Sequence, residues 1–409
     1  MVRFTGLDVH KRFIEVCIVD RAGKANFRGR TGCTREELIA FAKSKLKPTD
    51  QVALESTTNA WPAVEILRPF VARIVVGNPL KTKAIAEAKV KTDKVDAEVL
   101  AQLLRCDYLP EVWQPDDRTR QLRSWITHRT ALMAHRGRLK NQVHGLLGRL
   151  LIHSPHSLLW TKKGRAWLQA IVLPPHERVI LDSLLRQLDA LEVELIALDK
   201  VLAETARQLP QVPLLMTIPG LNYVVAMGLL AALGDISRFP DGDHAAAYLG
   251  LAPSTRQSGN RCYHGHITKP GNSQARWLLT QAAQHASRHA GPLGAFFRRL
   301  TKRKNRSVAI TALARKLVTI AYLMLKNNEP YRYANPELMR KKFTKLEVLP
   351  KRSKVGSDLD AIYRATGLPP VTTPDQLPKG ERQMLNEREL EQFVEGLYQP
   401  LNKKPKSKG

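Results

Sequence analysis

Four carboxylates in the first quarter of the sequence have the types and spacing of a metal site. Asp93 and Asp96 lie three residues apart at the start of a predicted helix, so their side chains project from one face. Asp8 lies on a short apolar run, and Glu55 ends another. Crowded carboxylates repel each other unless a cation lies between them, and hard oxygen ligands suit Mg²⁺. The four residues predict a divalent-metal site of the kind that supports phosphoryl transfer.

Each of these acids also has an ordinary explanation. Acidic residues are favoured in the first turn of a helix by the helix dipole, and Asp8 and Glu55, taken singly, are explained as turn or edge acids. The placement of all four together favours the metal site. His10 stands beside Asp8 and is interpreted as a packed or exposed histidine, because the oxygen set is already complete.

The elements that must position these acids are predicted by alternation, capping and turn signals. Strand ends and a helix start converge on one edge of a ribonuclease-H-like sheet, and the predicted order of elements is the order of that fold. The predicted strands are 4–9, 12–20, a third through Arg30, 51–55 and 72–77. The predicted helices run from Thr34 to about Lys45, from about 60 to 70, near 79–88, and onward from Asp93.

The composition indicates a nucleic-acid partner. Among 409 residues, Lys and Arg number 65 against 37 Asp and Glu, a formal net charge of +28. Such an excess repels itself unless a polyanion is bound. An acidic membrane surface is the alternative, but we find no long apolar segment and no room for a targeting peptide before the first strand. The 4 scattered cysteines match no zinc or disulfide spacing and indicate a reducing cytosol.

A basic helical segment follows, from Arg118 to Leu151. Its solvated face is nearly all of one sign, which favours a track along a nucleic-acid backbone. Trp125, Trp160 and Trp167 are candidates for stacking on bases, but core packing is the favoured interpretation. The residues predicted to contact phosphates here are Arg120, Arg123, Arg129, Arg136 and Lys140.

Leucines from Leu181 to Leu202 recur at alternating spacings of three and four, the a/d seam of a coiled coil. The seam is compatible with a helix hairpin or with an intermolecular coiled coil, and we expect an oligomerisation arm. A second domain follows from about Leu214 to Asn328. It contains a glycine-rich basic loop, 250–272, between two helices; long loops inside compact domains are usually functional. From Pro330 onward we expect a basic appendage with a disordered end.

The segments GLDVHK with Asp8, ALEST with Glu55, KTDKVDA with Asp93 and Asp96, and GLAPSTRQSGN with Ser258 occur in this order. Together they resemble insertion-sequence transposases of the 110/1111 group, the DEDD transposases or bridge-RNA-guided recombinases. The resemblance covers about Phe4 to Asn328, and the tail beyond it is longer than is usual in the family.

The resemblance implies an α/β plus α architecture in four parts. These are a RuvC-like, Mg²⁺-binding domain (1–115), basic helices with a coiled-coil arm (116–213), a mostly helical transposase domain with a serine loop (214–328) and a C-terminal extension (329–409). Asp8, Glu55, Asp93, Asp96 and Ser258 are the implied catalytic residues, with Ser258 as nucleophile. The implied partners are donor and target double-stranded DNA, a noncoding bridge RNA, and a second or further copy of the chain in a dimer or tetramer. A cytoplasmic, nucleoid-associated location follows.

Ser258 is interpreted as more than a turn residue because glycine follows it and cations flank it. Gly259 permits close approach of a substrate, and the flanking Arg256, Arg261 and Lys269 are suited to neutralising a phosphate. Two alternatives stay open: a metal-dependent Holliday-junction-type nuclease that uses water and needs no Ser258, and a non-catalytic nucleic-acid-binding protein.

Overall fold

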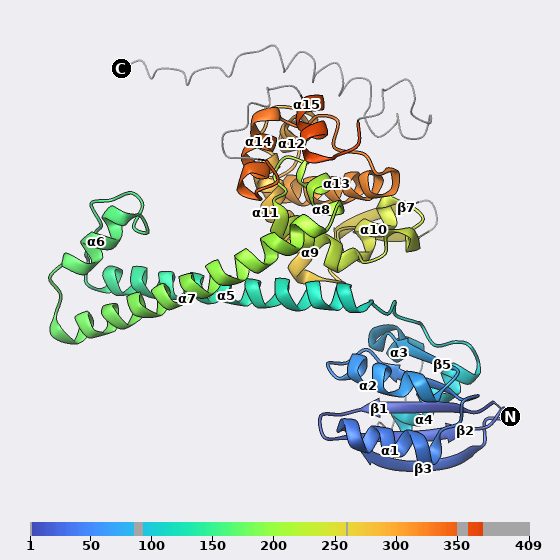
Figure 1. Cartoon of the computed structure of the whole chain (residues 1–409). Coiled ribbons are helices and arrows are strands. Elements are labelled where there is room, and N and C mark those ends of the chain that lie inside the picture. Colours follow the sequence, from blue (N-terminus) through green and yellow to red (C-terminus); the bar gives the residue numbers. More distant parts are fainter. Residues whose placement is uncertain (1, 86–92, 259–260, 350–358, 371–409) are drawn as a thin grey trace. The chain divides into compact units, whose positions relative to one another are not determined.

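The computed structural model of the protein describes residues 2–85, 93–258, 261–349 and 359–370. The chain divides into two units, Met1–Pro115 and Asp116–Gly409. The first is an α/β unit built on one sheet, and the second is mostly helical (Figure 1).

The N-terminal unit is organised around a mixed five-stranded sheet. The strands are β1 (Phe4–Val9), β2 (Phe13–Val19), β3 (Ala25–Gly32), β4 (Gln51–Glu55) and β5 (Arg73–Gly77), in the order β3-β2-β1-β4-β5. β1 pairs antiparallel with β2 and parallel with β4, and β4 pairs parallel with β5. β1, the central strand, is therefore flanked by one local partner and one distant partner along the chain.

Helices cover both faces of this sheet. One face packs on α1 (Arg35–Lys45) and α2 (Ala60–Leu67), and a capping box formed by Thr34 and Glu37 starts α1. The other face packs on α4 (Asp93–Arg105) through Ala97, Ala101, Leu100 and Leu104. A short α3 (Pro79–Ile85) follows β5. Thr92, which with Asp93 is a candidate from the sequence for capping α4, lies outside the described residues.

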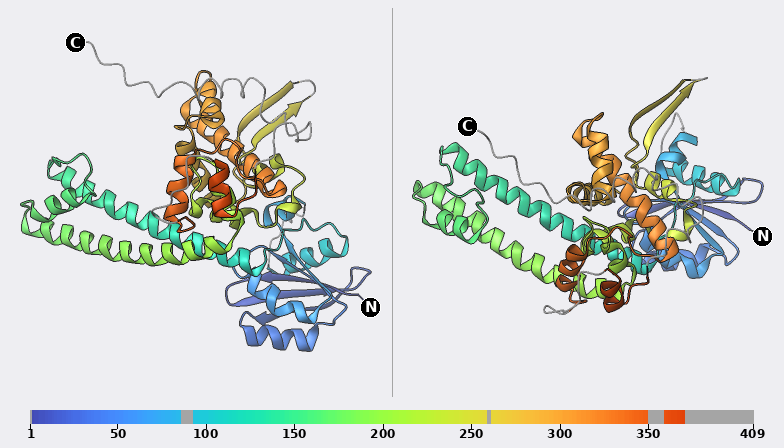
Figure 2. Two further views of the ribbon diagram at one scale, coloured as in Figure 1. Left: turned by 45° about the horizontal axis from the view of Figure 1, so that its top comes forward. Right: turned by 90° about the horizontal axis from the view of Figure 1, so that it is seen from above.

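The second unit begins with a long helical hairpin. α5 (Asp117–Arg149) and α7 (Pro175–Gln208) lie side by side, with α6 (Lys162–Ala170) at the tip (Figures 1 and 2). Leu139 to Leu147 of α5 share a core with Leu181 to Leu191 of α7, whereas Leu122 and Ile126 share one with Leu202. The two helices are therefore antiparallel.

This packing corrects the expectation that the leucine seam joins subunits. Leu181, Leu188 and Leu202 are fully buried within one chain, and Leu184, Leu191 and Leu195 nearly so. Of the two arrangements compatible with the spacing, the structure has the hairpin within one chain, because α5 supplies a complementary row of leucines.

The helical body consists of α8 (Gln211–Met216), α9 (Tyr223–Leu233), α10 (Gly242–Tyr248), α11 (Ser273–Ala286), α12 (Pro292–Thr301) and α13 (Arg306–Asn327). α13 is long and apolar enough to cross a membrane, contrary to the expectation that the chain has no such segment. Its Leu313, Ala314, Leu317 and Val318 are fully buried in the core of the unit, so it is accounted for as a core helix.

The predicted loop 250–272 contains a β-hairpin, which corrects the sequence analysis. β6 (Pro253–Ser258) pairs antiparallel with β7 (Arg261–Ile267), and the hairpin projects from the helical body (Figure 2). The two strands form a sheet of their own and present mostly polar residues, so no apolar alternation marked them.

The described residues after Pro330, which are 331–349 and 359–370, are not an appendage. α14 (Pro336–Lys345) and α15 (Leu359–Thr366) pack on the helical body. Tyr331, Met339, Phe343 and Tyr363 are buried in its core, which explains why the segment folds despite its many lysines. The expected disordered end, 371–409, lies outside the described residues.

Candidate active site

A glycine on β1 brings α4 against the sheet. A Cβ atom added at Gly6 would lie 1.9 Å from the carbonyl oxygen of Ala97, so only glycine permits this approach. Because side chains alternate along a strand, Asp8 points to the same side as Gly6, toward α4. The close approach therefore sets the first turn of α4, with Asp93 and Asp96, beside the end of β1.

Asp8, His10 and Asp93 form a cluster. Each offers a ligand atom within 4.8 Å of the other two. His10 Nε2 lies 2.9 Å from Asp8 Oδ2 and 3.3 Å from Asp93 Oδ2. Alternation along the chain places His10 on the same side as Asp8, and the His10 ring packs on Phe13 at 4.7 Å between centroids.

The cluster is electrostatically crowded. Burial is the main cause that raises the pKa of Asp8; His10 lowers that pKa through charge and hydrogen bonding, and the charges of Asp93 and Asp96 raise it further. Asp96 is thus close enough to Asp8 to repel it. A cation in this position would relieve the repulsion, as expected for a metal site.

Glu55 reaches the same edge from β4. Leu7 pairs with Leu54 in the parallel register, so Asp8 and Glu55 occupy the next positions on neighbouring strands. Ala53, two residues before Glu55, packs on the α4 side of the sheet. Alternation places Glu55 on that side as well, at the strand ends, although it is outside the three-residue cluster.

The donor set fits a divalent metal. Carboxylate oxygens from two strands and one helix are the ligands that hard cations prefer, and one imidazole nitrogen is compatible with several divalent ions. His10 is the residue that sequence reasoning left out. The available signal was its position two residues after Asp8 at a strand end, which places both side chains on one face.

The structure places Ser258 at the end of β6, paired in register with Arg261, the first residue of β7. The side chains of Arg256, Ser258 and Arg261 lie outside the described part of the structure. Lys269 is exposed, and its backbone adopts a left-handed conformation with φ of 63°. The hairpin thus presents Ser258 near its tip and Lys269 just past its root.

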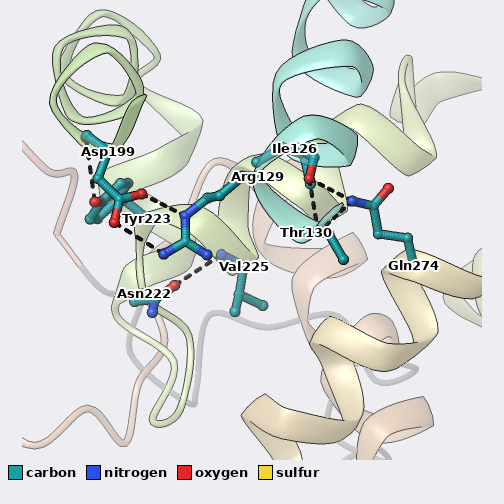
Figure 3. Close-up of polar contacts among 8 residues, drawn as sticks. All are labelled: Ile126, Arg129, Thr130, Asp199, Asn222, Tyr223, Val225 and Gln274. Atoms are coloured by element: carbon teal, nitrogen blue, oxygen red, sulfur yellow. Dashed lines mark hydrogen bonds and ion pairs between the residues drawn. The ribbon is translucent and has the colours of Figure 1, made fainter. Parts of the chain in front are cut away.

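Two of the predicted phosphate contacts are used within the protein instead. Arg123 donates to the carbonyl oxygens of Ala231 and Ala232 at the end of α9, and burial lowers its pKa. Arg129 pairs with Asp199 of α7, with Nε 2.5 Å from Oδ1 (Figure 3). Arg123 holds α5 to the helical body, and Arg129 holds α5 to α7, so neither is retained as a nucleic-acid contact.

The other predicted contacts on α5, at Arg120, Arg136 and Lys140, are half-buried. Arg120 pairs with Asp117, and Lys140 lies over the ring of Trp160 at 4.9 Å. Burial and the charge of Arg136 lower the pKa of Lys140. Trp125, Trp160 and Trp167 pack against the hydrophobic cores, the role favoured for them from the sequence.

Comparisons with known proteins agree with this layout. A family model described as the transposase IS116/IS110/IS902 family matches residues 212–298, and a transposase model of the IS110 DEDD type matches residues 5–152. The chain is 30% identical over 343 residues to a pilin gene-inverting protein of Moraxella bovis, covering 80% of this chain and 97% of that protein.

A second relative is named as a transposase. The chain is 24% identical to the transposase for insertion sequence element IS1111A of Coxiella burnetii, covering 81% of this chain and 92% of the relative. The matched models span both the carboxylate edge and the serine hairpin, in the order found here. The chain belongs to the IS110 family of DEDD transposases, enzymes that act on DNA.

Proposed function

We propose that this transposase joins donor DNA to target DNA by RNA-guided strand exchange, with Ser258 as nucleophile and Mg²⁺ held by Asp8, Glu55, Asp93 and Asp96. The observation that carries the proposal is the convergence of Asp8, His10 and Asp93 at one sheet edge in a member of a DNA-transposing family. The separate, cation-flanked serine hairpin supports a nucleophile other than water.

The carboxylates and His10 have distinct tasks in this proposal. Asp8, Glu55, Asp93 and Asp96 hold the divalent ion, which when bound polarises a phosphate and favours loss of a hydroxyl proton. His10, within hydrogen-bonding distance of Asp8 Oδ2, orients that carboxylate. The partial burial of Asp8 limits competition from water at the same edge.

The proposed chemistry at Ser258 conserves the number of phosphoester bonds. The serine Oγ forms a bond to a DNA phosphorus atom while the bond to one strand oxygen breaks, and the serine proton passes to a base as the departing oxygen is protonated. A hydroxyl of the partner strand then attacks the same phosphorus and releases the serine. Arg256 and Arg261 would stabilise the charge that develops on the phosphate, and Lys269, past the root of the hairpin, would contact the same strand farther along.

The charge distribution around the hairpin supports a polyanionic partner. From residue 244 to residue 328 the sequence contains 14 Lys and Arg and no Asp or Glu. We infer that this region contacts both DNA and a noncoding bridge RNA. We also infer a dimer or tetramer whose contacts lie outside the buried leucine seam, and a cytoplasmic location at the nucleoid.

Two other functions use part of the same structure. A metal-dependent, junction-resolving nuclease that uses water would need the carboxylate edge but not Ser258. A non-catalytic nucleic-acid-binding protein would need neither. Replacing Asp8 with Asn separates the second of these from both enzymes, because a pure binding protein would retain its full function.

The experiment that tests the proposal is a search for a covalent protein–DNA adduct. The reaction of the full-length protein with its RNA and DNA is quenched with denaturant, and the adduct is mapped by mass spectrometry. Ser258→Ala should lose both the adduct and strand exchange while still binding nucleic acid. Ser254→Ala, at the other end of β6, is the matched control and should retain both. Strand exchange by Ser258→Ala would favour the nuclease that uses water.

A further inference from the structure

A cavity of about 600 Å³ lies between the root of the serine hairpin and one face of α13. Its wall on the hairpin side includes Leu251, Pro253 and Ile267, and its wall on the helix side includes Val308 and Ala312. The volume is within the range of sites that hold small organic molecules. None of these residues takes part in the chemistry described above.

The cavity keeps apolar surface open to solvent. Val308 is 46% exposed although it lies on a helix whose next turns are deeply buried. Val308, Thr311, Ala312 and Arg315 are spaced so that they share one face of α13, and all four line the cavity. Their hydroxyl, methyl and guanidinium groups suit an occupant with a flat apolar body and polar edges.

The polar rim is cationic. Lys269 and His266 line the cavity from the hairpin side and are exposed, and Arg315 lines it from α13 while pairing with Asp243 at 3.1 Å. Asn305 and Ser307 also line the cavity. Four exposed cations lie next to them in the sequence: Lys302, Arg303, Lys304 and Arg306. An anionic group at the rim would therefore be attracted.

The position of Lys269 is fixed by a strained backbone. A left-handed conformation is unfavourable for lysine, and such strain persists where the surroundings hold it. The amide nitrogen of Lys269 donates to the carbonyl oxygen of Gly250 at 3.3 Å. A Cβ atom at Gly250 would lie 2.1 Å from the carbonyl oxygen of Pro270, so the turn has little freedom to move. The lysine is thus held at the rim.

We propose that the cavity takes one nucleotide of the DNA strand that enters the serine hairpin, with the base unstacked between the apolar walls and its phosphate near Lys269. The inference rests on the proposed function, since it assumes DNA along the hairpin. Enzymes that do chemistry on a DNA base extrude that base into a pocket at the expense of its stacking, so a protein pocket can hold an unstacked base. Ser258 lies five residues from Pro253 along β6, so the anchored nucleotide is a few positions from the reacting phosphate.

The test places 2-aminopurine, whose fluorescence rises on unstacking, at successive positions of the donor duplex around the exchange point. The duplexes are bound to the full-length protein assembled with its RNA. A rise at one or two adjacent positions is expected. Val308→Trp fills the cavity from an exposed site and should abolish that rise, whereas Val193→Trp, at another exposed helical valine on α7, should retain it.

Fluorescence anisotropy of the same duplexes reports DNA binding independently. Val308→Trp should still bind DNA, and Lys269→Asn, which tolerates the left-handed backbone, should weaken binding but retain the rise at saturation. No rise at any position while DNA is bound would overturn the inference and leave the proposed function intact. A fluorescence rise that persists in Val308→Trp would also overturn the inference. So would a rise that Val308→Trp abolishes only when the 2-aminopurine is in the RNA.

Discussion

Asp8 is the least exposed of the three clustered groups, with 19% of its side chain accessible against 36% for His10 and 47% for Asp93. A carboxylate in that position is costly to ionise when two other acids are near, and the raised pKa of Asp8 reflects this. The cluster therefore costs electrostatic free energy as it stands, and the metal ion proposed above would offset that cost.

Metal affinity should depend on Asp96 even though it is outside the three closest groups. Asp96→Asn keeps the shape of the side chain and removes a charge that acts on Asp8. We expect Mn²⁺ affinity, measured by titration calorimetry, to fall at least about tenfold and strand exchange to be lost, with the melting temperature preserved. Asp107→Asn, at a highly exposed acid of the same unit, is the control. Equal Mn²⁺ affinity in the two variants would contradict the assignment.

Lys342 is a buried amine whose role is structural. Its Nζ donates to the carbonyl oxygens of Met216 and Ile218, both at 2.7 Å, which ties α14 to the end of α8. Burial lowers its pKa from 10.5 to about 7. The neutral amine can make the same two hydrogen bonds, so the interaction persists when the proton is released.

The stability of the protein should rise with pH because of Lys342. Between pH 7 and 10.5 the unfolded chain binds the proton and the folded chain does not, so the free energy of unfolding increases across this window and the penalty is constant below it. Thermal melting from pH 6.5 to pH 10 should show this rise relative to Lys342→Met, which has no such group. His289, whose pKa burial and Lys342 both lower, titrates below the window. Parallel melting profiles for the two proteins would refute the assignment.

The α5–α7 hairpin depends on leucines whose spacing alone suggests an interface between subunits. Leu188 is fully buried against α5, whereas Val193, five residues later on the same helix, is 64% exposed. The alternation of buried and exposed positions shows that one face of α7 is satisfied within the chain. Arg129 and Asp199 reinforce the same pairing near the base of the hairpin (Figure 3).

Truncating the seam should lower stability without separating subunits. Leu188→Ala should cost about 2–5 kcal/mol of unfolding free energy, because it leaves a cavity in a packed core. Val193→Ala should change it by less than about 0.5 kcal/mol. Urea denaturation measures both, and light scattering on the folded proteins should give an unchanged mass. Loss of assembly in Leu188→Ala at full stability would restore the intermolecular interpretation.

Elements with a strong apolar pattern are predictable from the sequence, and polar ones are not. QVALE and RIVVG are predictable as buried strands because Val52, Leu54 and Val76 make them short apolar runs, and all three residues are fully buried. The β6–β7 hairpin has mostly polar positions, so it resembles a loop, and Phe343 and Tyr363 are easily overlooked among lysines. At the site, Asp8 and Asp93 are predicted from residue type and spacing, and they lie together in the cluster. His10 is passed over although it lies two residues after Asp8, because its contact with Asp93 depends on α4 returning to the end of β1.

The positive charge of the whole chain is concentrated in long stretches free of acids. The 85 residues from 244 to 328 have no carboxylate side chain, so local ion pairs within that stretch cannot neutralise its 14 cations. Pairs to acids elsewhere, such as Arg315 with Asp243, satisfy only some of them. Phosphates are the natural counter-ions for the rest.

The salt dependence of DNA binding should report the phosphate interactions of this stretch. The double variant Lys302→Gln, Lys304→Gln removes two exposed cations of this stretch. The double variant Lys162→Gln, Lys163→Gln removes two exposed cations on α6, outside the stretch, and serves for comparison. The plot of log affinity against log salt should be steep for the native protein, and removing each lysine that binds a phosphate should reduce the slope by about 0.9. Anisotropy titrations at several salt concentrations measure the slope. Identical slopes in the native protein and the Lys302/Lys304 variant would exclude this surface.

The close approach of Gly6 to Ala97 also affects the order in which the N-terminal unit folds while the chain is being synthesised. Until α4 has left the ribosome, the sheet face formed by Cys17, Val19, Ala53 and Val75 lacks its cover, because these residues pack on that helix or beside it. An uncovered apolar face is prone to aggregate. The last element of the unit to be synthesised is thus the one that both covers this face and brings Asp93 and Asp96 to Asp8. A nascent chain cannot assemble the carboxylate cluster before the sheet that carries it has become complete.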